Sequence, residues 1–299
     1  MTIADGFKTL LARIEPTARD STVYDTHRQS ITRRLETVFS TTKVDLIGSY
    51  SRGSGIRSIS DIDLLLKLKR DEVRRGNGYK SSTTILEHVR TELLNRYPNT
   101  SVVRDVHAVV VKFADNQYPV DVVPGFYYQQ GGALNYPVFA IPNGAGGWMP
   151  ASPQAHNKFI NDADVRSGGK LKRTAKLIKF WRHCRTPSIP LNSFYVELFL
   201  AQEKVCLPAM SYGVCFNNAL AKLANRQCQP LSDPVGISGQ IPAAHTEDKR
   251  RKAQEALIAS ANRAYRAIQA EKNGNAGEAL RVWDLVFNGY FPKNAVAAA

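Results

Sequence analysis

Apolar side chains recur every three or four positions near the start of the chain. This spacing is that of one face of a helix, and it predicts a first helix within residues 2–17 that ends near Pro16. A second, longer helix is expected from a cap at Ser21 and Thr22 to about Phe39. Further helices are predicted over residues 81–97, 152–164, 211–226, 246–272 and 276–287.

Short apolar runs between these helices predict the strands of a mixed sheet. Strands are expected at residues 44–47, 61–68, 101–113 and 118–123, and the last should pair back on the one before it. Residues 70–80 should form a charged loop. Residues 125–150 are rich in Gly, Pro and aromatic residues with little periodicity, so we expect loops and one short strand there. Helices with a mixed sheet make the fold class α/β (α+β).

Two acids lie on one of these strands, among apolar residues. Asp61 and Asp63 are two positions apart, so in an extended chain they share one face while the alternating apolar residues face the core. Adjacent carboxylates repel each other and are costly to bury, which favours a bound cation. A third acid, Asp121, lies inside another apolar strand. Such oxygen ligands suit Mg²⁺, with Mn²⁺ as the alternative ion.

Gly48 and Ser49 end the strand that precedes these acids. A turn at this place has free backbone N–H groups, and these groups with the Ser49 hydroxyl are suited to hold a phosphate. An Asp-x-Asp pair alone is more typical of a surface strand. The Gly-Ser turn, a short polar spacer, the pair Asp61 and Asp63 and the later Asp121 are together far more specific.

Composition and charge set the remaining limits. The 299 residues suit two lobes or one large domain, and 43% of them are hydrophobic, enough for a sizeable core. The four cysteines lack metal-ligand spacing and predict reduced thiols in a cytoplasmic protein. No apolar run has the length of a membrane span, and a signal peptide is not expected. The net charge of +14 favours polyanionic partners, so nucleotides are expected and a nucleic-acid surface stays open.

Cations gather in the run of residues 166–185, which holds eight Lys or Arg and no acid. On a helix, Lys172, Lys176, Lys179 and His183 would form one stripe. Most charge runs of this kind are solvated faces. Because no acid within the run relieves the repulsion, an anionic ligand is the interpretation that the sequence favours here.

These motifs resemble those of the nucleotidyltransferase superfamily that includes DNA polymerase beta, CCA-adding enzymes and poly(A) polymerases. The elements that carry the likeness are Gly48-Ser49, Arg52-Gly53-Ser54, Ser60 to Leu64 and Pro119 to Pro124. The chain is most similar to the branch of oligoadenylate synthase, cyclic GMP–AMP synthase and the bacterial cGAS/DncV-like nucleotidyltransferases. The likeness covers most of the chain, although Ser54 stands where the family often has Thr.

The resemblance implies a polymerase-beta-like nucleotidyltransferase core plus a helical second lobe. Residues 1–165 would form the core with its N-terminal helices, and residues 166–299 would form the lobe that closes the active-site cleft. Gly168 and Gly169 would be the hinge. The tail of residues 294–299 is expected to be disordered.

The resemblance also implies the roles of individual residues. Asp61 and Asp63 would bind two Mg²⁺ ions, and Asp121 would bind the ion that activates the acceptor hydroxyl. The residues implied for nucleotide binding are Gly48, Ser49, Arg52, Asn157, Asn161, Lys176, Lys179, Ser193, Phe194 and Tyr195.

Within that set, Lys179 matches the family's triphosphate lysine better than Lys176 does, and Ser193 would contact the same phosphates. Phe194 would stack on a base, and Tyr195 is the alternative ring. Asn157 and Asn161 follow a Pro-x-x-His stretch that lies close to the nucleotide in the family, so they are candidates to contact a base edge.

The implied activity joins ribonucleoside triphosphates into a cyclic di- or trinucleotide second messenger and releases pyrophosphate, in bacterial antiphage signalling. The enzyme is expected to be a monomer, with a regulatory or effector protein as a further partner. Two alternatives stay open: a template-independent RNA-tailing enzyme that uses the same acids, and a non-catalytic nucleic-acid-binding protein on this scaffold. The presence of all three acids argues against the last. The bases, the ring size and the linkage do not follow from the sequence.

Overall fold

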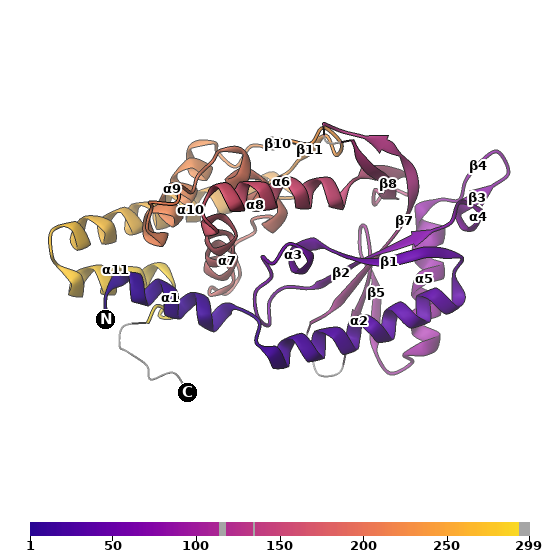
Figure 1. The fold of residues 1–299 in the computed structure, drawn as a ribbon, viewed down its shortest axis with the longest axis horizontal. Coiled ribbons are helices and arrows are strands. Elements are labelled where there is room, and N and C mark those ends of the chain that lie inside the picture. The colour runs from indigo at the N-terminus through magenta and orange to yellow at the C-terminus, as the bar shows by residue number, and fades with distance from the viewer. Residues whose placement is uncertain (114–117, 134, 293–299) are drawn as a thin grey trace. The chain divides into compact units, whose positions relative to one another are not determined.

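A mixed sheet of seven strands forms in the computed structural model, which describes residues 1–113, 118–133 and 135–292 (Figure 1). The strand order is β1-β2-β7-β6-β5, and β8 and β9 continue the sheet from the C-terminal half of β7. Strands β2 and β7 are parallel, whereas the other paired strands are antiparallel. The bounds are β1 Thr41–Ile47, β2 Ile62–Leu68, β5 Ser101–Arg104, β6 Val109–Lys112, β7 Val120–Gly131, β8 Tyr136–Pro142 and β9 Trp148–Ala151.

Helices α2 (Ala18–Val38) and α5 (Ser82–Arg96) pack on one face of this sheet. Thr17 caps α2 in a capping box with Asp20, and Ser81 caps α5. Buried aliphatic side chains fill the space between these helices and the strands, among them Ile31, Leu35, Ile85, Val89, Ile62, Leu64, Leu66, Val120 and Val122. Because side chains alternate along a strand, the residues between these apolar positions point to the other face.

Two strand predictions are wrong in detail. Residues 101–113 form a hairpin instead of one strand, because Asp105 closes a turn: its N–H donates to Ala108 O at 2.8 Å and its side chain accepts from Val106 N at 2.7 Å. Residues 125–150 are mostly strand, in β7, β8 and β9. An irregularity in the β7–β8 register between residues 127 and 129 breaks the two-residue period that sequence inspection relies on.

Two smaller differences concern residues near the N-terminal half of the sheet. Helix α2 begins before the predicted cap at Ser21 and Thr22, because Thr17 already supplies a complete capping box. The expected loop at residues 70–80 contains helix α4 (Arg70–Val73) and a small hairpin. The strands of that hairpin are β3 Arg74–Arg75 and β4 Gly78–Tyr79.

The remaining helices build a second unit around an aromatic core, in which Phe7 makes edge contacts with Trp283 and Phe291. Helix bounds are α1 Ile3–Ile14, α6 Pro153–Arg166, α7 Lys170–His183, α8 Ser193–Gln202, α9 Tyr212–Asn225, α10 Glu247–Lys272 and α11 Ala276–Val286. A two-stranded ribbon of β10 (Leu231–Ser232) and β11 (Gln240–Ile241) belongs to the same unit. All the helices predicted in this part of the chain are present.

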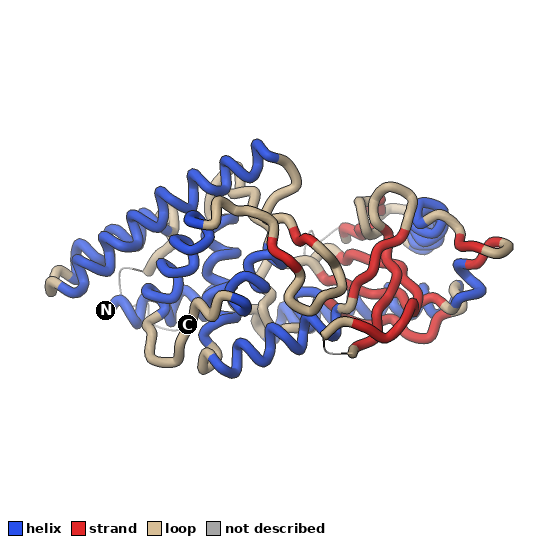
Figure 2. Tube along the Cα trace, turned by 90° about the horizontal axis from the view of Figure 1, so that it is seen from above, coloured by secondary structure: helices blue, strands red, loops and turns tan. Residues whose placement is uncertain are grey.

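The two compact units are not continuous in sequence, and Figure 2 shows helix dominating one and strand the other. The sheet unit holds residues 16–158 and 235–239, and the helical unit holds residues 1–15, 159–234 and those from 240 onward. Contacts thus assign the first helix to the helical unit, whereas the predicted division was 1–165 and 166–299. The boundary near residue 158 falls inside α6.

None of the helices in the described ranges combines the length and the apolar character needed to cross a membrane. The tail predicted at residues 294–299 lies outside the described residues.

Candidate active site

Three strand ends meet at one edge of the sheet. Strands β2 and β7 are parallel and so begin at the same edge, where Asp63 is the register partner of Asp121. Strand β1 is antiparallel to β2, so it ends at this edge with Ile47 opposite Asp63. The next residues, Gly48–Ser51, form the one-turn helix α3. Residues far apart in sequence are therefore neighbours here: the Gly-Ser turn, Asp63 and Asp121.

The strand acids point away from the core under α2 and α5. The residues on either side of Asp63 and Asp121 are buried in that core, while the two acids themselves are only partly buried. Asp61, one residue before β2, is exposed. Asp63 lies on the face opposite its apolar neighbours, as predicted, but Asp61, which was expected to share that face, precedes the first residue of β2.

The Asp63 side chain packs directly against the backbone of Gly48. Gly48 has φ +68°, in the left-handed region that side chains disfavour. A Cβ atom built on Gly48 would overlap the Asp63 carboxylate. Glycine is therefore required here for two separate reasons, and the turn and the acid form one packed unit.

The acids at this edge repel one another. Burial, followed by the charges of Asp61, Asp63 and Asp105, raises the pKa of Asp121 to about 8, and Lys112 opposes this only in part. Solvent reaches Asp61, yet surrounding protein atoms remove enough of its hydration to raise its pKa as well. Within the part of the chain that the structure describes, the buried Oδ1 of Asp121 has no hydrogen-bond partner. Lys112 therefore offsets only part of the burial and repulsion that act on Asp121.

The carboxylate oxygens of these acids are suitable ligands for a cation, but the described side chains do not form a complete metal site in their present conformations. Among the described residues, no three Asp, Glu, His or Cys side chains come close enough to hold a metal ion together. Neighbouring strands lie about 4.8 Å apart, so Asp63 and Asp121 start from adjacent backbone positions.

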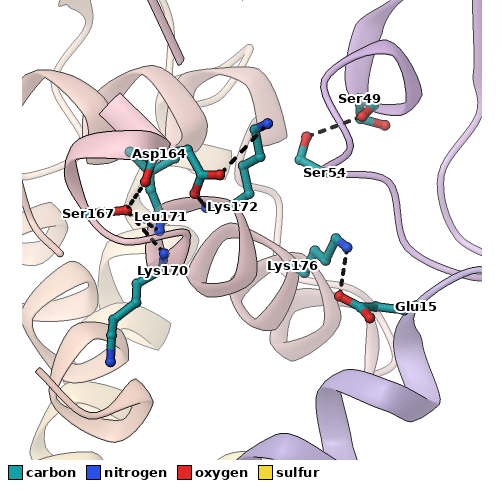
Figure 3. Close-up of polar contacts among 9 residues, drawn as sticks. All are labelled: Glu15, Ser49, Ser54, Asp164, Ser167, Lys170, Leu171, Lys172 and Lys176. Carbon is teal, nitrogen blue, oxygen red and sulfur yellow. Dashed lines mark hydrogen bonds and ion pairs between the residues drawn. The ribbon is translucent and has the colours of Figure 1, made fainter. Parts of the chain in front are cut away.

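Hydrogen bonds brace the turn after Gly48. Ser54 N donates to Ser49 O at 2.9 Å, and the Ser54 hydroxyl also reaches Ser49 O, as Figure 3 shows. The other predicted residues near the turn, Arg52 and Asn157, bond to each other at 3.2 Å, and Asn157 also bonds to Ser51 at 3.0 Å. Arg52 is buried, with 6% of its surface exposed. The structure thus gives both amide atoms of Asn157 partners within the protein.

Three lysines of α7 are each paired with a carboxylate, whereas Lys170 donates to the backbone carbonyl of Met210. Lys172 Nζ lies 3.8 Å from Asp164, and Lys176 Nζ lies 2.9 Å from Glu15 (Figure 3).

Lys179 Nζ lies 2.5 Å from Glu197, and both side chains are buried. No acid lies within the run, as the sequence shows, but acids from other segments of the chain pair with these lysines and weaken the argument for an anionic ligand. Phosphate binding by Lys176 or Lys179 stays a prediction, and it would have to compete with these pairs.

Asn192 caps the start of α8: its Oδ1 accepts the N–H of Phe194 at 2.9 Å. Ser193 Oγ accepts a hydrogen bond from Arg182 at 2.6 Å. Phe194 is half-buried. Tyr195 is fully buried and its hydroxyl donates to a backbone carbonyl, so the structure makes it a core residue rather than a ring presented to a base.

Sequence inspection missed two residues that contact predicted ones. Arg182 of α7 donates a hydrogen bond to Ser193, and burial lowers the pKa of its guanidinium group to about 10. Ser51 lies two residues after Ser49, and its hydrogen bond with Asn157 is visible only in the structure. The predicted Asn161 has a buried Oδ1 with no hydrogen-bond partner among the described residues, and nothing further assigns it.

Comparisons with known proteins agree with this geometry. The family model described as the Second Messenger Oligonucleotide or Dinucleotide Synthetase (SMODS) domain matches residues 1–164, more than half of the chain. A probable cyclic nucleotide synthase of Bacillus cereus (strain VD146) is 23% identical, with 83% of this chain and 81% of that protein aligned. A cyclic AMP-AMP-AMP synthase of an Acinetobacter species is 25% identical, over 99% of this chain and 87% of the relative.

Among solved structures, Escherichia coli MS115-1 CdnC with ATP superposes with a TM-score of 0.74. The match covers 96% of this chain and 98% of that one at 17% sequence identity, so it shows a shared fold.

Proposed function

This chain belongs to the SMODS family of second messenger oligonucleotide or dinucleotide synthetases, and from that premise we propose that its sheet edge is the active site. The chain is a nucleotidyltransferase that makes a cyclic oligonucleotide. The main support for this active site is the pairing of Asp63 with Asp121 on adjacent strands, with Gly48 packed on Asp63. Asp61 completes the acidic set.

In the proposed reaction, a ribose hydroxyl of one nucleotide attacks the α-phosphorus of a bound triphosphate. The bond to the α-phosphorus forms as the bond to pyrophosphate breaks, and the hydroxyl proton must be taken up. Asp121 is suited to accept it, because its raised pKa matches that of a base working near neutral pH. The backbone of Gly48 and Ser49 would orient the phosphates.

The residues that would hold divalent metal are Asp61, Asp63 and Asp121, and the ions we propose are two Mg²⁺, with Mn²⁺ as a substitute. When bound, such ions neutralise phosphate charge and lower the pKa of the attacking hydroxyl. The unpartnered Oδ1 of Asp121 and the repulsion among the acids support this assignment.

ATP is the substrate that we propose first, with a cyclic trinucleotide as product, because an aligned relative is a cyclic AMP-AMP-AMP synthase. A cyclic dinucleotide is the other product within the same chemistry. A role in bacterial antiphage signalling, and a regulatory protein partner, belong to the same proposal. The raised pKa of Asp121, caused by burial and then by neighbouring acids, is typical of a catalytic site and supports a catalyst over a degenerate scaffold.

Product analysis tests the proposal directly. The purified chain is incubated with all four labelled ribonucleoside triphosphates and Mg²⁺ or Mn²⁺, and the products are treated with phosphatase and weighed by mass spectrometry. We expect a phosphatase-resistant product of two or three nucleotides, since a closed ring has no terminal phosphate. Extension of an added RNA primer, with nothing made from triphosphates alone, would replace the proposal with an RNA-tailing activity.

A further inference from the structure

A chain of three hydrogen bonds ties the one-turn helix α3 to helix α6. Ser51 Oγ donates to Gly48 O at 2.9 Å and accepts from Asn157 Nδ2 at 3.0 Å, and Asn157 Oδ1 accepts from Arg52 Nη1 at 3.2 Å. Asn157 lies 106 residues from Ser51 in sequence. We propose that Asn157 is a positioning residue that fixes the Gly48–Ser51 turn for nucleotide binding. Ser51, Arg52 and Asn157 are called the clamp below.

The turn needs such support because little in its own sequence holds it. A helix of four residues is not stable by itself, and α3 has no side-chain cap at its N-terminus. Its first residue, Gly48, is in the left-handed region, and glycine has the greatest freedom to leave that conformation. Tertiary contacts must therefore set the position of the turn.

The clamp has a defined direction, because the two ends of the Asn157 amide have different partners. The Asn157 amide offers a donor and an acceptor on opposite sides, and the structure uses the donor for Ser51 and the acceptor for Arg52. Arg52 is buried and so cannot follow a moving turn at little cost. The Ser51 hydroxyl donates its hydrogen bond to the carbonyl of Gly48, the residue whose backbone packs on Asp63. The clamp therefore fixes the backbone that separates the phosphate-binding turn from the acids.

This inference rests on the proposed function, in which the turn holds the triphosphate. It differs from the idea that Asn157 contacts a base. A base contact would change the preference among nucleotides when Asn157 is replaced. A positioning role would weaken the use of every nucleotide by the same factor, because the phosphates are common to all.

The test uses the full chain with Asn157→Ala, Ser51→Ala, the double variant, and Ser51→Thr, which keeps the hydroxyl. Gln154→Ala is the matched control, because Gln154 is an exposed amide on the same helix. The first readout is hydrogen–deuterium exchange of the peptide spanning residues 48–54 without nucleotide, which needs no catalysis. The second is kcat and KM with each of the four ribonucleoside triphosphates.

We expect exchange in this peptide to rise about tenfold in Asn157→Ala and in Ser51→Ala, the effect of losing one hydrogen bond. The double variant should add little to either, because both changes break one chain of bonds. Ser51→Thr and Gln154→Ala should match the wild type. KM should rise by one common factor for all nucleotides that are used, with a smaller change in kcat.

Unchanged exchange in both single variants would overturn the inference, and so would a change confined to one nucleotide. If the wild type made no product at all, the proposed function would fail, while the exchange result would still decide whether the clamp holds the turn. Ser51→Ala breaks the same series of hydrogen bonds at its other end. The inference can therefore still be tested if Asn157→Ala fails to fold.

Discussion

Helix α7 and the acidic edge of the sheet both gather like charges, and the structure treats them in opposite ways. On α7, Lys172, Lys176 and Lys179 each meet a carboxylate from another segment. At the sheet edge, burial and then the charges of neighbouring acids raise the pKa of Asp121. The fold pairs these three lysines with acids, whereas among the described residues the buried Oδ1 of Asp121 has no hydrogen-bond partner.

The contrast shows what a charge run means in a sequence. Like charges at helical spacing cost little when distant segments bring counter-charges, and this cannot be seen from the run itself. Asp121 lies on a strand next to the buried core, and among the described residues its buried Oδ1 has no hydrogen-bond partner. Uncompensated charge, rather than charge density, is the better sign of a site.

The largest effect should follow from replacing the acids. Asp63→Asn or Asp121→Asn should lower the rate of product formation by about 10²–10³-fold or more, because each removes charge that acts on the reacting groups. The fold should persist, since repulsion is relieved. Asp71→Asn, in exposed α4, is the control and should keep full activity. If Asp63→Asn and Asp121→Asn each formed product within tenfold of the wild-type rate, the assignment would be contradicted.

Two glycines with similar backbone conformations provide the next test. Gly48 and Gly53 have φ +68° and +70°, but a Cβ atom on Gly53 would meet no atom within 4 Å, whereas one on Gly48 would overlap Asp63. Gly53→Ala should cost only the strain of a left-handed residue, about 1–2 kcal/mol. Gly48→Ala should cost more and abolish activity. Chemical unfolding and product assays measure both, and equal losses for the pair would show that the Asp63 contact does not matter.

The lysine side of the comparison predicts effects on stability. Lys179→Met leaves the buried Glu197 carboxylate without the lysine charge, which should cost about 3–5 kcal/mol. Lys176→Met, whose partner Glu15 is partly exposed, should cost less than about 1 kcal/mol.

The double variant Lys179→Met/Glu197→Leu should recover most of the loss, as measured by denaturant unfolding. If nucleotide affinity stayed lost while stability returned, Lys179 would be a phosphate ligand after all.

The smallest effect concerns pH. Asp121 has a folded-state pKa raised to about 8, above that of an unfolded aspartate, so the stability it contributes is present at low pH and is lost as pH rises through 8. Without metal, the melting temperature should fall between pH 5 and 9, and Asp121→Asn should flatten that slope. Scanning calorimetry in EDTA measures the difference, and identical slopes would contradict the account.

The sequence was sufficient for the parts of the site that are local. Asp61 and Asp63 stand out because they interrupt an apolar strand, and Gly48 with Ser49 because they end one. The same reasoning found the helices, whose caps and periods lie within a few residues of each other. It also predicted a mixed sheet, although not that residues 101–113 would fold back on themselves.

The rest depends on contacts that join distant parts of the chain. Glu197 and Glu15 have no sequence relation to the lysines that they pair with. Asn157 was assigned to a base because its neighbours resemble a family motif, but its use inside the protein follows only from the packing of α6 near α3. Side-chain partners at this separation are set by the tertiary fold, which local patterns do not encode.

Binding of Mn²⁺ is the measurement that tests the central contrast most directly. Free Mn²⁺ is followed by electron paramagnetic resonance during titration of three proteins: wild type, Asp63→Asn/Asp121→Asn, and Lys172→Met/Lys176→Met. The account predicts that the wild type and the lysine variant bind the ion equally well, and that the acid variant loses this site. Equal binding by the acid variant, or no binding by the wild type, would contradict the claim that the sheet edge is where uncompensated charge awaits a cation.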